Sequence, residues 1–448
     1  MTGDTTLSYA EAVRALGERG RFGVRLGLGR TQALLRQLGD PQRELRGALV
    51  AGTNGKGSVL ALCGSVLRGA GLRVGETPKP HLVTYRERLQ IDGRPIAPDA
   101  FAALAARVLP LADRVARRHG EPTEFELLTA MLFRWFADEG VEVALVEVGL
   151  GGRLDATHAW DGGVAVVTNV DLDHTDRLGT TIRQIAREKA AIIERGDLAV
   201  TGATGEALSV IRGRARRVGA PLTVAAPAPL VRHDRDGIVA RLPRLGDVIV
   251  GLRGRHQAAN LAVADATLDA LAAAGLAATD DRQRRDGYAA ARWPGRLELL
   301  GVGGRDVLLD GAHNPAGAAA LAQALDDLRP HLSPGSVTLV MGAMADKDVA
   351  GIVAALSRSA ALRGATVIAT RVGANRALEA VDLAALWRAT DVPAQVLVSG
   401  DPMTALDLAL EQAEGAVVVA GSLYLVGAVR ARLFDDPLLR DPVPEGGG

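Results

Sequence analysis

The chain has 448 residues, 48% of them hydrophobic, which fits a globular protein of two domains. Its 52 basic and 52 acidic residues cancel, and this balance excludes a global field that would attract nucleic acid or an anionic membrane. The single cysteine excludes an internal disulfide, and the first 20 residues lack the apolar core of a secretory signal. We therefore expect a cytoplasmic protein with no nucleic-acid partner and no membrane-spanning segment.

Short apolar runs bounded by glycine alternate with segments of helical period from residue 47 onward. This alternation is typical of parallel sheets with crossover helices. The first repeat is a strand at 48–51, a glycine-rich turn and a helix at 56–67. Further strands of the same sheet are expected at 141–148, 164–169 and 198–201.

A capping box precedes the apolar-periodic segment 127–136. Thr123 stands at the N-cap and Glu126 follows three residues later, so that each side chain can accept a hydrogen bond from the other's backbone N–H. The same segment could contact a ligand instead. The sequence leaves both roles open.

The chain after the first sheet repeats the same alternation on a smaller scale. A helix runs from 260 to about 274, the polar stretch 280–286 resembles a connection, and we place the domain boundary at residue 295. No G-x-G-x-x-G fingerprint occurs beyond it, so this Rossmann-like domain need not bind a dinucleotide. The tail from Asp435 onward is expected to fray. Strands of the second domain are expected at 307–309, 337–341, 366–370, 395–398 and 417–420.

The segment Gly52-Thr53-Asn54-Gly55-Lys56-Gly57-Ser58 lies between the first strand and its helix. Backbone N–H groups and a helix N-terminus can surround phosphate oxygens there, and Lys56 would neutralise a triphosphate. The spacing departs from the usual P-loop because Gly57 separates the lysine from the hydroxyl of Ser58. Strand, lysine and hydroxyl together still favour a nucleotide site over a plain glycine-rich turn.

Glu147 ends an apolar strand, at the edge where open α/β sheets place their ligands. A carboxylate there suits Mg²⁺, which prefers oxygen ligands and keeps waters and substrate phosphates in its shell. His174 alone is weak evidence, since imidazole is a less usual Mg²⁺ ligand. Lys189 falls in an expected helix at 181–194, and the sequence alone predicts a solvated surface charge.

The glycine-rich heptapeptide and a series of later motifs resemble the folylpolyglutamate synthase/dihydrofolate synthase branch of the Mur ligase superfamily. The motifs match that family in order and spacing, over roughly residues 20 to 435. They are EVGLGGRLDAT at 147–157, Asp173-His174 with LGT at 178–180, IAREKA at 185–190, His256-Gln257 with Asn260, WPGR at 293–296, DGAHNP at 310–315, Asp346-Lys347-Asp348 and GSLYL at 421–425.

The resemblance implies an α/β fold: a P-loop-containing, Mur-ligase-like central domain at 1–295 and a smaller C-terminal Rossmann-like domain at 296–448. It implies an ATP-dependent ligase of folate biosynthesis and one-carbon metabolism. Such an enzyme activates a carboxylate as an acyl phosphate and adds L-glutamate to dihydropteroate, to reduced folates or to both. The implied partners are these small molecules and ATP, with Mg²⁺ as cofactor, and we expect a monomer.

The resemblance also assigns site residues, with domain closure expected to complete the nucleotide site. ATP is expected to contact Asn54, Gly55, Lys56, Gly57, Ser58, Asn260, Arg296 and Asp310. A pteroate or folate substrate is expected to contact Thr123, Glu124, Phe125, Glu126, Leu154, Asp155 and Ala156. Mg²⁺ is expected on Ser58, Glu147 and His174. The expected catalytic residues are Lys56, His174 and Lys189, the last carbamylated by carbon dioxide. His313 stays open between a ligand contact and a strand-to-helix turn.

Two positions depart from the family pattern. Lys79-Pro80-His81 stands where members usually carry Ser-Pro-His. That serine ligates magnesium in the family, and an ammonium ion cannot take its role. Lys79 could contact phosphate or the acyl phosphate instead, a water could replace the hydroxyl, or the lysine could point to solvent. His158 stands where asparagine is common, with an unknown effect.

Two other functions stay open. A cell-wall Mur ligase acting on a UDP-linked muramoyl peptide shares the P-loop and the mechanism, but the segments 86–89 and 155–157 favour folate. A P-loop protein that binds ATP as a switch, without ligase chemistry, predicts nucleotide binding without turnover. Lys79 is the one feature that favours the switch.

Overall fold

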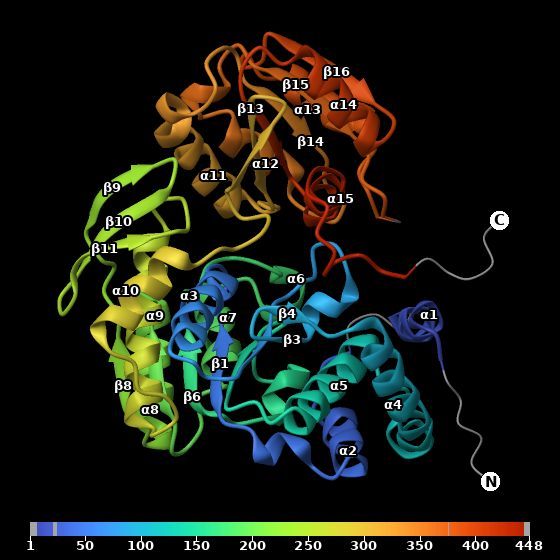
Figure 1. The fold of residues 1–448 in the computed structure, drawn as a ribbon, viewed down its shortest axis with the longest axis vertical. Coiled ribbons are helices and arrows are strands. Elements are labelled where there is room, and N and C mark those ends of the chain that lie inside the picture. The colour runs from blue at the N-terminus through green and yellow to red at the C-terminus, as the bar shows by residue number, and fades with distance from the viewer. Residues whose placement is uncertain (1–6, 21–24, 375, 443–448) are drawn as a thin grey trace. The chain divides into compact units, whose positions relative to one another are not determined.

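The computed structural model describes residues 7–20, 25–374 and 376–442 (Figure 1). Its contacts divide the chain into two compact units whose segments interleave along the sequence. The expected boundary at residue 295 stays a prediction for the functional domains. The first unit comprises residues 1–227, 259–287 and 437–448, and the second comprises 228–258 and 288–436.

An eight-stranded sheet in the order β4-β3-β2-β5-β1-β6-β7-β8 forms the centre of the first unit. Six strands run parallel, while β3 and β4 make an antiparallel edge. The four strands expected from the apolar runs are confirmed as β1, β5, β6 and β7. The strands are β1 Gly47–Ala51, β2 Val74–Thr77, β3 Gln90–Ile91, β4 Arg94–Pro95, β5 Val143–Glu147, β6 Gly163–Val167, β7 Leu198–Thr201 and β8 Leu222–Val224.

The register of the central strands decides which residues meet at one edge. β1 lies between β5 and β6, and Val50 pairs with Glu147 on one side and Val166 on the other. The turn after β1 and the end of β5 therefore lie next to each other. Both faces of these strands are buried, as is typical of parallel sheets covered by helices on both sides.

Helices cover both faces of this sheet. α1, α2, α4, α5, α7 and α8 share one hydrophobic core with alternate strand residues such as Leu49 and Val146. α3 packs on the opposite face, where Ser65 donates to the carbonyl of Gly287 at 2.7 Å. The helices are α1 Tyr9–Gly20, α2 Gly29–Gln37, α3 Lys56–Gly69, α4 Pro98–His119, α5 Glu124–Asp138, α6 Thr175–Leu178, α7 Ile182–Ala190, α8 Gly205–Val218, α9 Gln257–Ala273 and α10 Asp281–Ala290.

The polar stretch 280–286 was expected as a connection, and the structure corrects this to helix α10. Arg284 is 2% exposed, and it donates to the Asp265 carboxylate at 2.7 Å and pairs with Asp269 at the same distance. These ion pairs with α9 satisfy a buried guanidinium. A segment that is polar in sequence therefore packs as a helix.

The expectation that the tail frays is also wrong for residues 437–442. The guanidinium of Arg86 donates to the carbonyls of Leu438 and Arg440, both at 2.9 Å, and to the Asp441 carboxylate at 3.1 Å. Because these acceptors satisfy a cation that is 3% exposed, they fix the tail on the first unit. We call residues 437–442 with Arg86 the tail clip.

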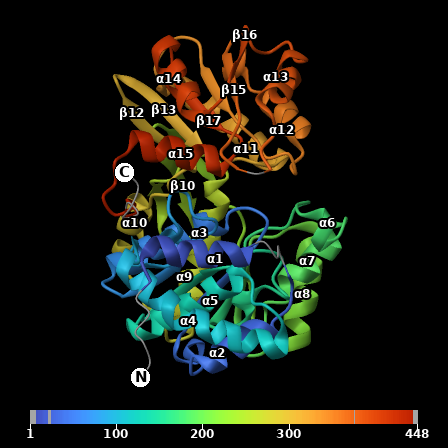
Figure 2. The same cartoon turned by 90° about the vertical axis from the view of Figure 1, so that its right-hand side faces the viewer.

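The second unit contains a six-stranded sheet in the order β12-β13-β17-β14-β15-β16 and an antiparallel sheet β11-β10-β9 (Figure 2). The five parallel strands predicted for this Rossmann-like part are confirmed, as β13 to β17. β12 and the small antiparallel sheet were not predicted. The strands are β9 Leu230–Asp234, β10 Gly237–Leu242, β11 Gly246–Val250, β12 Glu298–Val302, β13 Arg305–Asp310, β14 Thr338–Met341, β15 Thr366–Thr370, β16 Gln395–Ser399 and β17 Val417–Ala420.

Helices also cover both faces of the larger sheet of the second unit. α11, α12 and α13 share a core with one face, and α14 and α15 pack on the other (Figure 2). Among the residues that the structure describes, no helix of either unit has the length and apolarity to cross a membrane. The helices are α11 Pro315–Leu328, α12 Val349–Leu356, α13 Ala380–Arg388, α14 Pro402–Gln412 and α15 Leu423–Leu433.

Candidate active site

The glycine-rich turn leaves β1 and ends at Lys56, the first residue of α3. Gly55 has φ +81°, and a Cβ there would collide with the side-chain oxygen of Asn260, so the position requires glycine. The turn thus presents bare backbone at a helix N-terminus, the arrangement that binds phosphate. It also brings Asn260 of α9 beside the turn, and the contact of Asn260 with ATP stays a prediction.

The remaining residues of the turn are fixed by neighbouring loops. The backbone N–H of Asn54 donates to the side-chain oxygen of Asn169 at 2.9 Å, and the Thr168 hydroxyl donates to the Asn54 carbonyl at 2.6 Å. Gly57 and Ser58 lie in the first turn of α3, where Ser58 is 7% exposed. Hydrogen bonds to neighbouring loops therefore hold the backbone of the turn.

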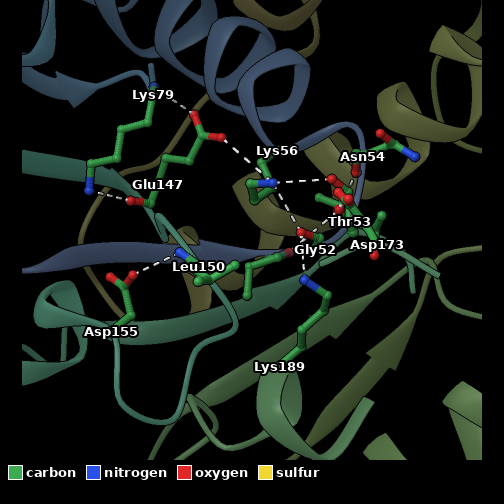
Figure 3. Close-up of polar contacts among 12 residues, drawn as sticks. Gly52, Thr53, Asn54, Lys56, Lys79, Glu147, Leu150, Asp155, Asp173 and Lys189 are labelled. Atoms are coloured by element: carbon green, nitrogen blue, oxygen red, sulfur yellow. Dashed lines mark hydrogen bonds and ion pairs between the residues drawn. The ribbon is translucent and has the colours of Figure 1, made fainter. Parts of the chain in front are cut away.

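Lys56 and Glu147 face each other beside this turn (Figure 3). The ammonium of Lys56 donates to the carbonyls of Gly52 at 3.0 Å and Thr53 at 3.2 Å, and its Nζ lies 3.9 Å from Glu147 Oε1. Glu147 is 4% exposed at the end of β5. A lysine and a buried carboxylate at the phosphate-binding turn are suited to a triphosphate and its metal ion.

The loop after β2 folds Lys79 against Glu147 (Figure 3). The backbone N–H of Lys79 donates to Glu147 Oε2 at 3.1 Å, and its Nζ donates to the Glu147 carbonyl at 2.7 Å. Burial lowers the pKa of Lys79 to about 8, although the charges of Asp155 and Glu147 act in the opposite direction. The possibility that this lysine points to solvent is therefore excluded.

Lys189 is 5% exposed, which corrects the sequence-based expectation of a surface charge. It shares the buried face of α7 with Ile185, one helical turn away, and its Nζ donates to the Gly52 carbonyl at 3.0 Å. Burial, together with the nearby charge of Lys56, lowers the pKa of Lys189 to about 7. A large share of this amine is neutral at physiological pH.

His174 lies at the surface, with φ +48° and its side chain 41% exposed. Its Nε2 is 3.8 Å from the Asp173 carboxylate. Among the described residues, no three or more His, Cys, Asp and Glu side chains are grouped so as to hold a metal ion. The assignment of Ser58, Glu147 and His174 to Mg²⁺ stays a prediction, and the buried carboxylate of Glu147 is the donor that fits a hard cation best.

The capping box at the start of α5 is confirmed. Glu126 accepts from the backbone N–H of Thr123 at 2.7 Å, and Thr123 accepts from the N–H of Glu126 at 3.3 Å. Both Glu126 oxygens also accept from Arg30 at 3.0 Å, so this carboxylate is fully engaged. Contact of the segment with a substrate stays a prediction.

Phe125 and Asp155 meet over Gly149. A Cβ on Gly149 would lie 2.7 Å from the Phe125 ring and 3.1 Å from Asp155 Oδ2, so glycine permits this close approach. Asp155 accepts from the backbone N–H of Leu150 at 2.8 Å and caps the 3-10 helix Ala156–Ala159. The Lys79 Nζ lies 4.5 Å from the Phe125 ring centroid, a cation–π contact that joins segments far apart in the sequence.

The two predicted nucleotide residues of the second unit lie next to each other. Asp310 ends β13 and accepts from the backbone N–H groups of Leu297 and Ala312, both at 2.9 Å. Burial raises the pKa of Asp310, and the charge of Arg296 opposes this shift. His313 Nδ1 lies 2.7 Å from the Gly311 carbonyl in the turn before α11. Contact of Arg296 and Asp310 with ATP stays a prediction.

The first unit also holds the three remaining residues predicted to contact the substrate, and His158, which departs from the family pattern. Glu124 and Leu154 are partly buried and Ala156 is buried, in the same two segments as Phe125 and Asp155. The Nδ1 atom of His158 lies 3.1 Å from the carbonyl oxygen of Arg153, so this side chain supports the loop after β5. Gly149 and Arg30 were not predicted as supports of the site, because nothing in a single sequence signals either contact.

Two family models match the chain. The Mur ligase middle domain matches residues 50–268, and the Mur ligase, glutamate ligase domain matches residues 295–423. Together they span the phosphate-binding turn, Glu147, Lys189 and the Asp310 turn.

Relatives of known name extend over nearly the whole chain. The dihydrofolate synthase/folylpolyglutamate synthase of Bacillus subtilis is 34% identical, over 95% of this chain and 99% of the relative. A probable bifunctional folylpolyglutamate synthase/dihydropteroate synthase of Haloferax volcanii is 37% identical over 95% of this chain. That relative is longer, and the match covers 50% of it.

The fold is similar to that of solved structures. A Mycobacterium tuberculosis folylpolyglutamate synthase complexed with ADP and AMPPCP aligns with a TM-score of 0.83 and 34% identity, covering 95% of this chain and 100% of that chain.

Proposed function

This chain belongs to the dihydrofolate synthase/folylpolyglutamate synthase family of Mur ligases, and on that basis we propose that it adds L-glutamate to dihydropteroate and to reduced folates with ATP. One observation carries the proposal most directly. The phosphate-binding turn with Lys56 lies beside the buried Glu147, and Lys79 joins Glu147 to Phe125 in the segment assigned to the pterin-bearing substrate.

The first chemical step makes the carboxylate reactive. A carboxylate oxygen of the substrate forms a bond to the γ-phosphorus of ATP while the bond from that phosphorus to the bridging oxygen breaks, giving an acyl phosphate and ADP. Lys56 and the backbone N–H groups of the turn stabilise the charge on the transferring phosphoryl group. Positioning of the two substrates supplies much of the remaining acceleration.

The second step joins glutamate. The amine of L-glutamate forms a bond to the acyl carbon, the bond from that carbon to the phosphate oxygen breaks, and inorganic phosphate leaves. The amine loses a proton to solvent or to a base. The same acyl-activation site serves dihydropteroate and reduced folates, since both present a carboxylate to the turn.

Glu147 and Ser58 are the residues of the first unit that would hold Mg²⁺ together with nucleotide oxygens. The bound ion supplies charge neutralisation on the phosphates. His174 is retained as a third candidate ligand and as a catalytic candidate from the family resemblance. The monomeric state and the location in the cytoplasm stay predictions.

Lys189 is proposed to be carbamylated. Carbon dioxide forms a bond to the neutral amine, which loses a proton and becomes an anionic carbamate. A pKa of about 7 supports this reaction, because an ordinary lysine with pKa 10.5 is almost wholly protonated at neutral pH. The carbamate would also replace the repulsion between two cations, Lys56 and Lys189, with an attraction.

Phosphate release by the purified protein with ATP, Mg²⁺ and glutamate tests the proposal. Dihydropteroate and a reduced folate are offered in separate assays, with a no-acceptor control and mass spectrometry of the products. Turnover with both supports the proposal, and turnover with one alone reduces it to that activity. Turnover with a UDP-linked muramoyl peptide instead would favour a cell-wall ligase. ATP binding without turnover would favour a switch protein.

A further inference from the structure

The backbone N–H and the side-chain ammonium of Lys79 both donate to Glu147. Its backbone N–H donates to the carboxylate of Glu147 at 3.1 Å, and its side-chain ammonium donates to the carbonyl of Glu147 at 2.7 Å (Figure 3). The lysine side chain is therefore folded along the end of β5. Its charge is held at the sheet edge where the site lies.

The ammonium keeps donors that the described residues do not use. An ammonium has three N–H donors, and the one hydrogen bond from Lys79 Nζ within the described residues goes to the Glu147 carbonyl. No ion pair between the described residues includes the Lys79 Nζ; burial lowers its pKa, although the nearby charges of Asp155 and Glu147 act to raise it. A partly buried cation without an ion pair favours binding of an anion.

The surroundings fix where such an anion would bind. One side of the ammonium is covered by the Phe125 ring at 4.5 Å, which Gly149 allows to approach the end of β5. Phe125 lies in one segment assigned to the pterin-bearing substrate, and Asp155 lies in the other. The free donors of Lys79 thus lie between the substrate segments and Glu147.

Two lysines flank Glu147 in different ways. Lys56 Nζ faces its carboxylate from the phosphate-binding turn, at 3.9 Å from Oε1, whereas Lys79 Nζ reaches its backbone carbonyl (Figure 3). Transfer of a phosphoryl group to a carboxylate brings two anions together, which requires positive charge near both. Lys56 is placed for the donor, and Lys79 for the acceptor.

We propose that Lys79 is a catalytic residue whose ammonium binds the substrate carboxylate that receives the phosphoryl group, and then the carbonyl oxygen of the acyl phosphate. The inference rests on the proposed function. Lys79 stays protonated throughout: the carboxylate oxygen bonds to the γ-phosphorus, the bond to ADP breaks, and the lysine contributes hydrogen bonds and charge alone.

Equilibrium binding of dihydropteroate and of its uncharged carboxamide tests the inference. The wild type is expected to bind dihydropteroate more tightly than the carboxamide. K79M should reduce this ratio of affinities by about 10- to 100-fold. Its affinity for ADP should change by less than about threefold. K79R, which keeps the charge, is expected to restore part of the preference. R94M removes an exposed cation from β4 of the same sheet and serves as the matched control.

The outcomes separate the inference from the proposed function. If the wild type turns over dihydropteroate and K79M keeps the full preference for the carboxylate, the role of Lys79 is overturned and the ligase proposal stands. If K79M weakens ADP and both pteroate ligands equally, Lys79 is a structural residue and the inference also fails. If the wild type turns over neither dihydropteroate nor a reduced folate, the proposed function fails, and the inference fails with it.

Discussion

The segment from Lys79 to Arg86 carries two cations with opposite environments, one in the candidate active site and one in the tail clip. Arg86 donates to four acceptors: the Asp441 carboxylate and the carbonyls of Ile96, Leu438 and Arg440. Lys79 makes one side-chain hydrogen bond within the described residues. A satisfied buried cation holds structure together, whereas one with donors left over favours a ligand.

The same contrast separates the two regions as a whole. In the tail clip the network closes on itself: Thr84 donates to Asp441 at 2.7 Å, and the Tyr9 hydroxyl lies 3.0 Å from that of Thr84. In the active site Lys56 and Lys79 flank the buried carboxylate of Glu147, and Lys189 donates to the carbonyl of Gly52 in the adjoining turn. We therefore expect substitutions in the active site to change turnover more than stability, and substitutions in the tail clip to do the reverse.

The largest effect is expected for K56M. Loss of the charge next to the transferring phosphoryl group should lower kcat by about 10³-fold. The free energy of unfolding should change by less than about 1 kcal/mol, because the lysine's hydrogen bonds go to carbonyls of its own turn and its ion pair with Glu147 is long, at 3.9 Å. Steady-state kinetics and urea unfolding measure both. A large loss of stability with little loss of kcat would contradict the expectation that active-site substitutions change turnover more than stability.

K189M is expected to lower kcat by about 10²-fold if the carbamate acts near the phosphates. In the wild type depleted of carbon dioxide, activity should return on its addition, and the recovery at a fixed dissolved level should increase as pH rises through about 7, where the amine becomes neutral. ¹³C NMR with labelled bicarbonate would detect the carbamate. No labelled carbamate at pH 8 would contradict the assignment.

Lys189 also predicts a pH dependence of stability. Its folded pKa of about 7 lies below the ordinary 10.5, so between these values the unfolded chain binds more protons than the folded chain. The free energy of unfolding of the unmodified protein should then increase with pH over this window relative to K189M. Thermal unfolding of both proteins in carbon dioxide-free buffer at pH 7 and 9 measures the difference. Equal responses to pH would show that the folded protein does not shift this lysine.

R86M should cost about 2 kcal/mol in the free energy of unfolding, roughly 30-fold in the equilibrium, since it removes the donor shared by three carbonyls and the Asp441 carboxylate. kcat/KM should stay within about threefold of the wild type. Urea unfolding beside the R94M control measures the stability. A loss of activity at temperatures where R86M is fully folded would show that the clip also positions the active-site loop.

The smallest effect is expected for D441N. The Asp441 side chain is 39% exposed, so solvent screens its pairing with Arg86, and the loss should be about 1 kcal/mol or less. The Arg86 bonds to the tail carbonyls remain in this variant. A loss as large as that of R86M would mean that the ion pair, not the carbonyl contacts, holds the tail.

Patterns local in the sequence predicted local structure well. The parallel strands followed from apolar runs, the capping box from Thr123 and Glu126, and the turn between β1 and α3 from its glycines. The antiparallel sheet β9–β11 was missed because many of its residues are exposed and charged, as at Arg232, so that no apolar run marks it.

Features that depend on distant partners could not be predicted. Nothing near Lys189 in the sequence shows that its amine reaches the Gly52 carbonyl, 137 residues away. The Lys79 contact with Phe125 and the tail clip on Arg86 likewise join separate segments. The helix α10 was missed for the same reason, since Arg284 is satisfied by side chains of α9.

Transfer of oxygen-18 from the substrate tests the central claim most directly. Dihydropteroate labelled in its carboxylate is incubated with the protein, ATP, Mg²⁺ and glutamate, and the released phosphate is examined by mass spectrometry. Activation as an acyl phosphate predicts one labelled oxygen in the phosphate for each glutamate added. Glutamate addition with unlabelled phosphate, or with the label in AMP, would contradict the account.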